Sequence, residues 1–139
     1  MKKIFVIILF FGFISCSNTD DGNPFLPNVP VSETVRLSNP SSLDLQVPSG
    51  YISITGGISG IFVYNLNNTT FYAFDRACPH VAPQNCAPMV VNDGINMECP
   101  CDGAKFAMPI GGQPQSGTQY AARQYQVIKN GDTLFITNF

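Results

Sequence analysis

Short runs rich in apolar, aromatic and β-branched residues, several of them alternating with polar residues, follow one another along most of the chain. Such alternation is typical of half-buried β-strands, because successive side chains of a strand point to opposite faces of a sheet. The predicted strands cover residues 34–37, 43–47, 51–54, 60–64, 70–74, 89–91, 95–98, 125–129 and 132–137. After the first fifteen residues, no segment keeps the 3.6-residue period of an amphipathic helix. The pattern predicts one small all-β domain over residues 33–139.

Three pairs of these runs are joined by residues that favour tight hairpins. The connections are Asn-Asn at 67–68, Asn-Asp-Gly at 92–94 and Asn-Gly at 130–131. Asn and Gly tolerate the positive φ angles that short hairpin turns require. The first hairpin leads into Cys78 and the second into Cys99. Each of these cysteines is therefore expected to lie where a rigid strand ends.

The most apolar stretch of the chain is at its start. Lys2 and Lys3 precede the apolar run 4–14, which is short for a membrane span and is typical of a signal peptide. The run ends in Phe-Ile-Ser-Cys at 13–16, which resembles a bacterial lipobox, although Leu is usual at its first position. The resemblance implies cleavage before Cys16 and attachment of lipid to that cysteine. Ordinary secretion, with Cys16 as an incidental thiol, is the alternative.

The segment after this signal is polar and then rich in proline. We expect residues 1–15 to be a lipoprotein signal peptide and residues 16–32 a flexible, Pro-rich tether. Cleavage would leave five Lys and Arg against nine Asp and Glu, a net charge of about −4. That balance does not favour nucleic acid or an anionic membrane surface as a ligand. We therefore expect the protein in the bacterial cell envelope, attached to the membrane by lipid on Cys16.

Two loops hold the residues best suited to bind a metal. The first is Cys-Pro-His at 78–80, and the second is Cys-Pro-Cys-Asp-Gly-Ala-Lys-Phe at 99–106. The pair resembles the cluster-binding loops of Rieske iron–sulfur proteins, which carry Cys-x-His and Cys-Pro-x-His-Gly-x-x-Phe or Tyr. Asp102 stands where that family has its second histidine. Asp75 and Arg76, just before the first loop, are interpreted as a strand end with surface charges.

The resemblance implies a Rieske-like fold, in which an antiparallel sandwich or barrel carries an inserted rubredoxin-like subdomain. It also implies a 2Fe–2S cluster, with Cys78 and Cys99 on one iron and His80 on the other. Asp102 is the candidate fourth ligand, and an exposed turn residue that binds no metal is the alternative. Ala104 replaces a serine that donates a hydrogen bond to the cluster in high-potential relatives. A carboxylate ligand and the loss of that donor would both lower the reduction potential.

The resemblance further implies a disulfide that ties the two loops together. Cys101 occupies the position of one half of that bond in high-potential Rieske proteins. Cys86 lies about three residues further beyond His80 than the partner cysteine of the family. The implied pair is Cys86–Cys101, which would be stable in the oxidising compartment that an export signal supplies.

The function implied is that of an electron carrier, not an enzyme, with a redox partner protein that the sequence does not name. We expect no small-molecule substrate, because one histidine leaves little for acid–base catalysis and no Ser/His/Asp set or phosphate loop is visible. Two alternatives remain. The domain could be a surface binding module that has lost its cluster, or Cys78, His80, Cys99 and Asp102 could hold a single zinc ion.

Overall fold

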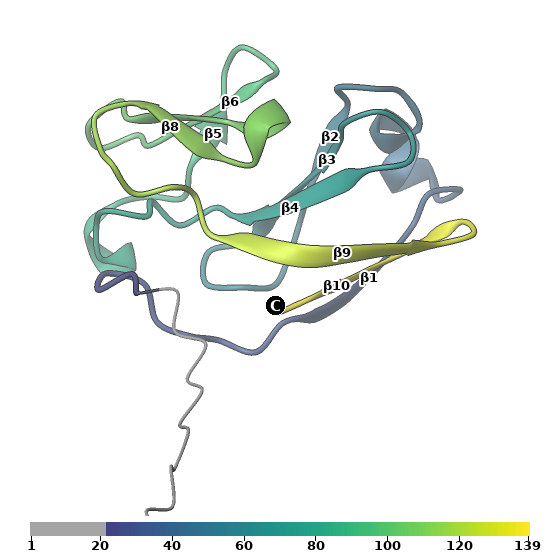
Figure 1. Cartoon of the computed structure of the whole chain (residues 1–139), viewed down its shortest axis with the longest axis horizontal. Helices are drawn as coiled ribbons and strands as arrows, with labels where there is room; N and C mark the ends of the chain where they lie inside the picture. Colours follow the sequence, from purple (N-terminus) through teal and green to yellow (C-terminus); the bar gives the residue numbers. More distant parts are fainter. Residues whose placement is uncertain (1–21) are drawn as a thin grey trace, which may run out of the picture.

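Two antiparallel sheets make up the part of the chain that the computed structural model describes, residues 22–139 (Figure 1). The larger sheet has the order β1 (Ser32–Arg36), β10 (Thr133–Thr137), β9 (Gln124–Asn130), β4 (Phe71–Asp75), β3 (Ile61–Asn65) and β2 (Tyr51–Ile54). The smaller sheet has the order β5 (Val90–Val91), β6 (Asn96–Glu98), β7 (Lys105–Ala107) and β8 (Gln113–Ser116). Three short 3-10 helices, η1 (Pro40–Gln46), η2 (Pro83–Asn85) and η3 (Met108–Ile110), complete the described elements.

The smaller sheet is an insertion in the larger one. The chain leaves the larger sheet at the end of β4 and returns to it at β9, and these two strands pair through Ala73–Tyr125 and Phe74–Gln124. Everything between them, including all four strands of the smaller sheet and both candidate metal-binding loops, lies to one side (Figure 1). We call the larger sheet with its helix η1 the base, and the inserted residues 76–123 the tip.

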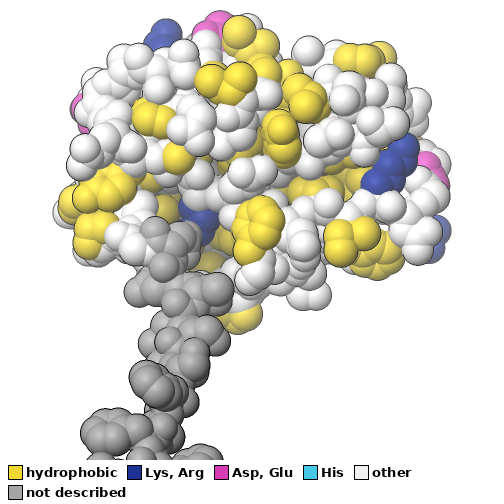
Figure 2. Space-filling view, in the orientation of Figure 1, with side chains coloured by type: hydrophobic (Ala, Val, Ile, Leu, Met, Phe, Trp, Pro, Cys, Tyr) yellow, Lys and Arg dark blue, Asp and Glu magenta, His cyan; other side chains and the backbone are white. Residues whose placement is uncertain are grey.

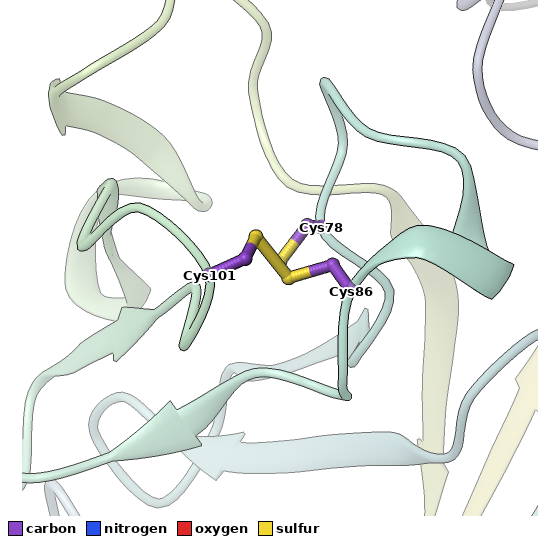
Figure 3. Close-up of side chains that lie close together, drawn as sticks. All are labelled: Cys78, Cys86 and Cys101. Atoms are coloured by element: carbon purple, nitrogen blue, oxygen red, sulfur yellow. A yellow bond between two sulfur atoms is a disulfide. The ribbon is translucent and has the colours of Figure 1, made fainter.

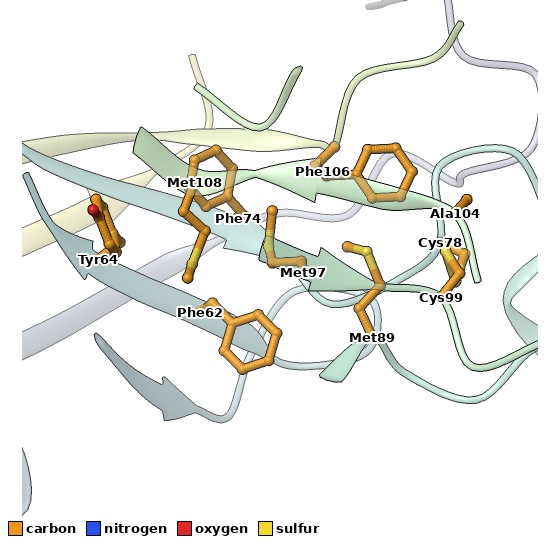
Figure 4. Packing of buried hydrophobic residues seen from close by; sticks show 11 residues of the cluster. Phe62, Tyr64, Phe74, Cys78, Met89, Met97, Cys99, Ala104, Phe106 and Met108 are labelled. Atoms are coloured by element: carbon orange, nitrogen blue, oxygen red, sulfur yellow. A yellow bond between two sulfur atoms is a disulfide. The ribbon is translucent and has the colours of Figure 1, made fainter. Parts of the chain in front are cut away.

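Buried side chains form two cores, one in the base and one between base and tip. The base core contains Val31, Val35, Leu45, Ile61, Val63, Phe71, Ala73, Tyr125, Leu134 and Ile136. The tip core contains Phe62, Tyr64, Phe74, Cys78, Met89, Met97, Cys99, Ala104, Phe106, Met108 and Ala122 (Figure 4).

Strand β3 joins the two cores because it is buried along its whole length. Ile61 and Val63 enter the base core, whereas Phe62 and Tyr64 enter the tip core. Successive side chains of a strand point to opposite faces, so this continuous apolar run packs on both sides. The tip is thereby fixed to the base next to the two candidate metal-binding loops.

The strand content differs from the sequence-based expectation at three places. Strand β7, only three residues long after the second loop, was not predicted. The run 43–47, predicted to be a strand, lies mostly in η1, where Pro40 takes a first helical position that needs no N–H donor. Only Leu45 of its two leucines is buried, and Leu43 is 56% exposed. Strand β8 was not expected because it is polar and contains Pro114. It forms the edge of the smaller sheet, where a proline is tolerated.

The Pro-rich stretch before β1 packs along the protein within the described residues. Leu26 and Val31 are buried there. The Asn23 side-chain amide donates to the Pro79 carbonyl at 2.7 Å, and the Val31 N–H donates to the Asn138 side chain at 2.7 Å. The packed part therefore begins near Asn23 rather than at the expected boundary. The predicted signal peptide and Cys16 lie outside the described residues.

Apolar side chains also reach the surface in several places. On the face shown in Figure 2 they are scattered between polar groups, and few charged side chains are visible. The exposed large apolar residues belong to several different elements, namely Phe25, Leu43, Val47, Val90, Ile95, Ile110, Ile128, Phe135 and Phe139. Within residues 22–139, no helix is both long and apolar enough to cross a membrane.

Candidate metal centre

Asp75, the last residue of β4, holds the first loop against the base. Its side chain is fully buried, so the interpretation of Asp75 as a surface charge is wrong. Its carboxylate accepts hydrogen bonds at 2.6–3.2 Å from the backbone N–H groups of Ile58, Ser59 and Ala77 and from the Tyr125 hydroxyl. A buried carboxylate needs such donors to offset its loss of water. Because Ala77 immediately precedes Cys78, these bonds set the position of that cysteine.

Gly57 makes room for this carboxylate. A Cβ atom at Gly57 would overlap Oδ2 of Asp75, and the residue has a φ angle of +62°, which L side chains rarely adopt. The loop at 57–59 can therefore fold over the end of β4 only because position 57 has no side chain. Neither the burial of Asp75 nor the role of Gly57 was expected, because both depend on a contact between segments far apart in the sequence.

The second loop is the tip of the hairpin between β6 and β7. The Cys99 N–H donates to the Ala104 carbonyl at 2.9 Å, and the Gly103 N–H donates to the Cys99 carbonyl at 2.8 Å. Gly103 has a φ angle of +75°, a conformation that glycine adopts without strain. These bonds close the loop into a fixed turn that presents Cys99 inward and leaves Cys101 and Asp102 exposed.

The loops meet through their cysteines. Cys78 and Cys99 are buried, their Cα atoms are 5.7 Å apart, and their sulfur atoms are bonded to each other. Cys86 and Cys101 are bonded as well, with Cα atoms 5.6 Å apart. The Cys78 sulfur lies 3.4 Å from that of Cys86, against the Cys86–Cys101 pair (Figure 3). All four sulfur atoms therefore lie together, a contact between the two pairs that the sequence did not indicate.

His80 and Asp102 lie on the more exposed side of the centre. The His80 Nε2 atom is 2.5 Å from Asp102 Oδ2, and the Ala104 N–H donates to Asp102 Oδ1 at 3.0 Å. The hydrogen bond from His80, followed by that from Ala104, lowers the pKa of the Asp102 carboxyl from its ordinary value. The other ring nitrogen of His80, Nδ1, is buried and has no hydrogen-bond partner within residues 22–139.

The donor atoms suit a small metal centre. One ligand atom each from His80, Cys99 and Asp102 can be chosen so that all three lie within 4.8 Å of one another, and Cys78 is adjacent to Cys99. Thiolate sulfur and imidazole nitrogen are the donors that iron–sulfur and zinc sites use. Cysteine binds metal as a thiolate, so metal binding by Cys78 and Cys99 and a bond between their sulfurs exclude each other.

Comparisons with known proteins identify the fold class of the domain. No protein-family model and no curated protein matches the chain. Among solved structures, the ferredoxin of carbazole 1,9a-dioxygenase from Nocardioides aromaticivorans IC177 is 18% identical, with a TM-score of 0.50 over 81% of this chain and all of that one. The fold is that of Rieske-type ferredoxins. The all-β, Rieske-like class predicted from the two loops is thus confirmed.

Two further solved structures match less well. A chain of the complex of reduced oxygenase and oxidized ferredoxin in carbazole 1,9a-dioxygenase is 21% identical, with a TM-score of 0.48 over 75% of this chain and 92% of that one. The Escherichia coli protein NirD is 10% identical, with a TM-score of 0.48 over 79% of this chain and 98% of that one. At these identities the likeness concerns the fold alone.

Proposed function

We propose that the protein is an electron carrier with a Rieske-type 2Fe–2S cluster. Cys78 and Cys99 would bind one iron and His80 the other, with Asp102 as the candidate fourth residue. The observation that carries this proposal is the meeting of the two loops, which brings two buried cysteines next to the one histidine of the chain. The Rieske-like fold of the domain supports the same assignment.

The surroundings of the centre are suited to moving electrons. When bound, a 2Fe–2S cluster accepts and releases one electron at a time. Phe106 and Met97, both fully buried, pack in the tip core with the two cysteines and exclude water from their inner side. The His80 side chain is 13% exposed and therefore reaches the surface, where a redox partner protein could approach it. The partner is unidentified, and we propose no small-molecule substrate.

We propose that the protein works in the bacterial cell envelope, anchored by lipid on Cys16. The lipobox-like sequence at 13–16 supports the anchor, and the Cys86–Cys101 bond fits an oxidising compartment. Metabolic labelling with a radioactive fatty acid tests this. The full chain should carry the label in the membrane fraction, and the Cys16→Ala variant should not. Label on both proteins, or on neither, would contradict the anchor.

A second candidate function is a cluster-free binding module with the same fold. The bond between the Cys78 and Cys99 sulfurs favours it, because a domain held by two disulfides would need no metal. A mononuclear zinc site built from Cys78, His80, Cys99 and Asp102 is a third form of the same centre.

Spectra of protein purified without oxygen separate these forms. The 2Fe–2S form is red-brown and becomes paramagnetic when reduced with dithionite. A zinc form is colourless, gives no such signal and contains zinc by elemental analysis. A cluster-free form is colourless, contains neither metal and has no free thiols at Cys78 and Cys99. The last two outcomes would each overturn the electron-carrier proposal.

A further inference from the structure

Asp102 is already engaged by the protein through both of its carboxylate oxygens. Oδ2 contacts His80 Nε2 at 2.5 Å, and Oδ1 accepts the Ala104 N–H at 3.0 Å. To bind a metal directly, the carboxylate would have to give up at least part of this arrangement. The second contact also holds the carboxylate within its own loop, because Ala104 is only two residues away in the same tight turn.

The contact with Asp102 determines which nitrogen of His80 is available to a metal. A carboxylate accepts hydrogen bonds and donates none, so Nε2 carries the proton and Nδ1 carries the lone pair. Nδ1 is also the buried nitrogen that has no partner within the described residues. A buried acceptor of this kind is unfavourable unless something binds it, and a metal ion would do so. Metal-binding histidines commonly donate their other N–H to a carboxylate in this way.

We infer that Asp102 is a positioning residue that holds His80 for metal binding through Nδ1, and is not itself a metal ligand. This inference rests on the proposed function. It leaves three protein ligands, Cys78, Cys99 and His80, where the related loops supply four. The outer iron would then keep one position for a small nitrogen or sulfur donor from solution. The Asp102 side chain is 41% exposed, so such a donor could reach this side of the centre.

The single histidine of the chain makes the first test unambiguous. The full-length protein is produced with histidine carrying ¹⁵N at Nδ1 in one sample and at Nε2 in another. Both are purified without oxygen, reduced, and examined by pulsed electron paramagnetic resonance. The Nδ1 label should give the strong coupling of a nitrogen bound to iron, and the Nε2 label the weak coupling of a remote one. Strong coupling from Nε2, or from neither nitrogen, would overturn the inference.

Substitutions at Asp102 then separate a positioning role from ligation. Asp102→Asn keeps an oxygen that can accept from Nε2, so this variant should retain its iron and the His80 coupling. Asp102→Ala removes the acceptor of the His80 Nε2 hydrogen bond, so this variant should retain iron but show a changed His80 coupling. Asp93→Asn, which alters an exposed acid in the neighbouring turn, is the matched control and should change neither. Loss of half or more of the iron from Asp102→Asn would show that Asp102 is a ligand.

Unlabelled imidazole tests the open position in the ¹⁵N-labelled wild-type protein. Imidazole should add a second, ¹⁴N coupling, and Asp102→His should show a second histidine coupling without it. No change with saturating imidazole in the wild type would contradict the open position. These results are distinct from failure of the proposed function itself, which would appear earlier as wild-type protein lacking iron and sulfide and would remove this inference with it.

Discussion

Cys78 and Cys99 are 21 residues apart in the sequence, yet their Cα atoms lie 5.7 Å apart in the folded protein. One follows the end of β4 and the other follows the end of β6, so each is supplied by the exit of a strand. The two strands belong to different sheets, and the tip core that packs between those sheets contains both cysteines. Convergence of the loops is thus a consequence of how the tip packs on the base.

The buried carboxylate of Asp75 should be essential to the stability of the tip. Asp75→Ala leaves three backbone N–H groups and the Tyr125 hydroxyl without this acceptor, and we expect a loss of about 3 kcal/mol or more in the free energy of unfolding. Urea denaturation followed by circular dichroism measures it. Asp44→Ala, at an exposed position, is the control and should change stability by less than about 0.5 kcal/mol. Equal effects of the two substitutions would contradict the role of Asp75.

The bond between Cys86 and Cys101 should stabilise the fold independently of any metal. It closes a loop with a sequence separation of 15. A cross-link over such a loop lowers the conformational entropy of the unfolded chain, which should increase the free energy of unfolding by about 3 kcal/mol. In oxidising buffer, we expect the free energy of unfolding of the Cys86→Ser/Cys101→Ser double variant to be lower than that of the wild type by this amount. A reducing agent should lower the wild-type stability and leave that of the variant less affected. Full wild-type stability of the double variant would contradict the prediction.

The reduction potential of the centre should be low for a Rieske-type protein. The Asp102 carboxylate places negative charge beside His80, and Ala104 has no hydroxyl to donate to the centre, so both disfavour an added electron. We expect a potential well below about +300 mV, the upper end for such centres. Asp102→Asn and Ala104→Ser should each raise it by several tens of millivolts, and Asp93→Asn by much less. A wild-type potential near the upper end in a redox titration would refute this account.

The hairpin that leads into Cys99 contains a carboxyl group with a low pKa. Hydrogen bonds from the Asn96 side chain and from the backbone N–H groups of Asn96 and Ile95 lower the pKa of Asp93 to about 2. Because the folded-state pKa is depressed, the stabilisation by Asp93 is present above its unfolded pKa and is lost as pH falls from about 4 through about 2. Carbon-13 nuclear magnetic resonance of the carboxyl group checks this. A midpoint near 4 would contradict these bonds.

Local patterns were sufficient to predict most of the strands. Alternation and turn residues indicated β2, β3, β4, β9 and β10 close to their observed bounds. The prediction of a strand at 43–47 was wrong, because two leucines separated by one polar residue also fit a short 3-10 helix that begins at Pro40. Strand β8 gave no apolar signal, because pairing with β7 at the edge of a sheet does not require one.

For the candidate metal centre, the sequence predicted which residues lie together but not how their side chains are oriented. The resemblance of the two loops indicated Cys78, Cys99, His80 and Asp102 as neighbours, and the structure brings them together. The orientation of His80 toward Asp102 depends on side-chain contacts across 22 residues of sequence, which no local pattern records. The burial of Asp75 was missed for the same reason, since its partners at 58–59 lie in a different loop.

Analysis of iron and acid-labile sulfide in the full-length protein, purified without oxygen, tests the central claim most directly. The wild type should contain about two irons and two sulfides per chain. The Cys78→Ser and Cys99→Ser variants should contain almost none, while Asp93→Asn should match the wild type. Wild-type protein that is folded but free of iron and sulfide, with Cys78 and Cys99 joined to each other, would contradict the electron-carrier account.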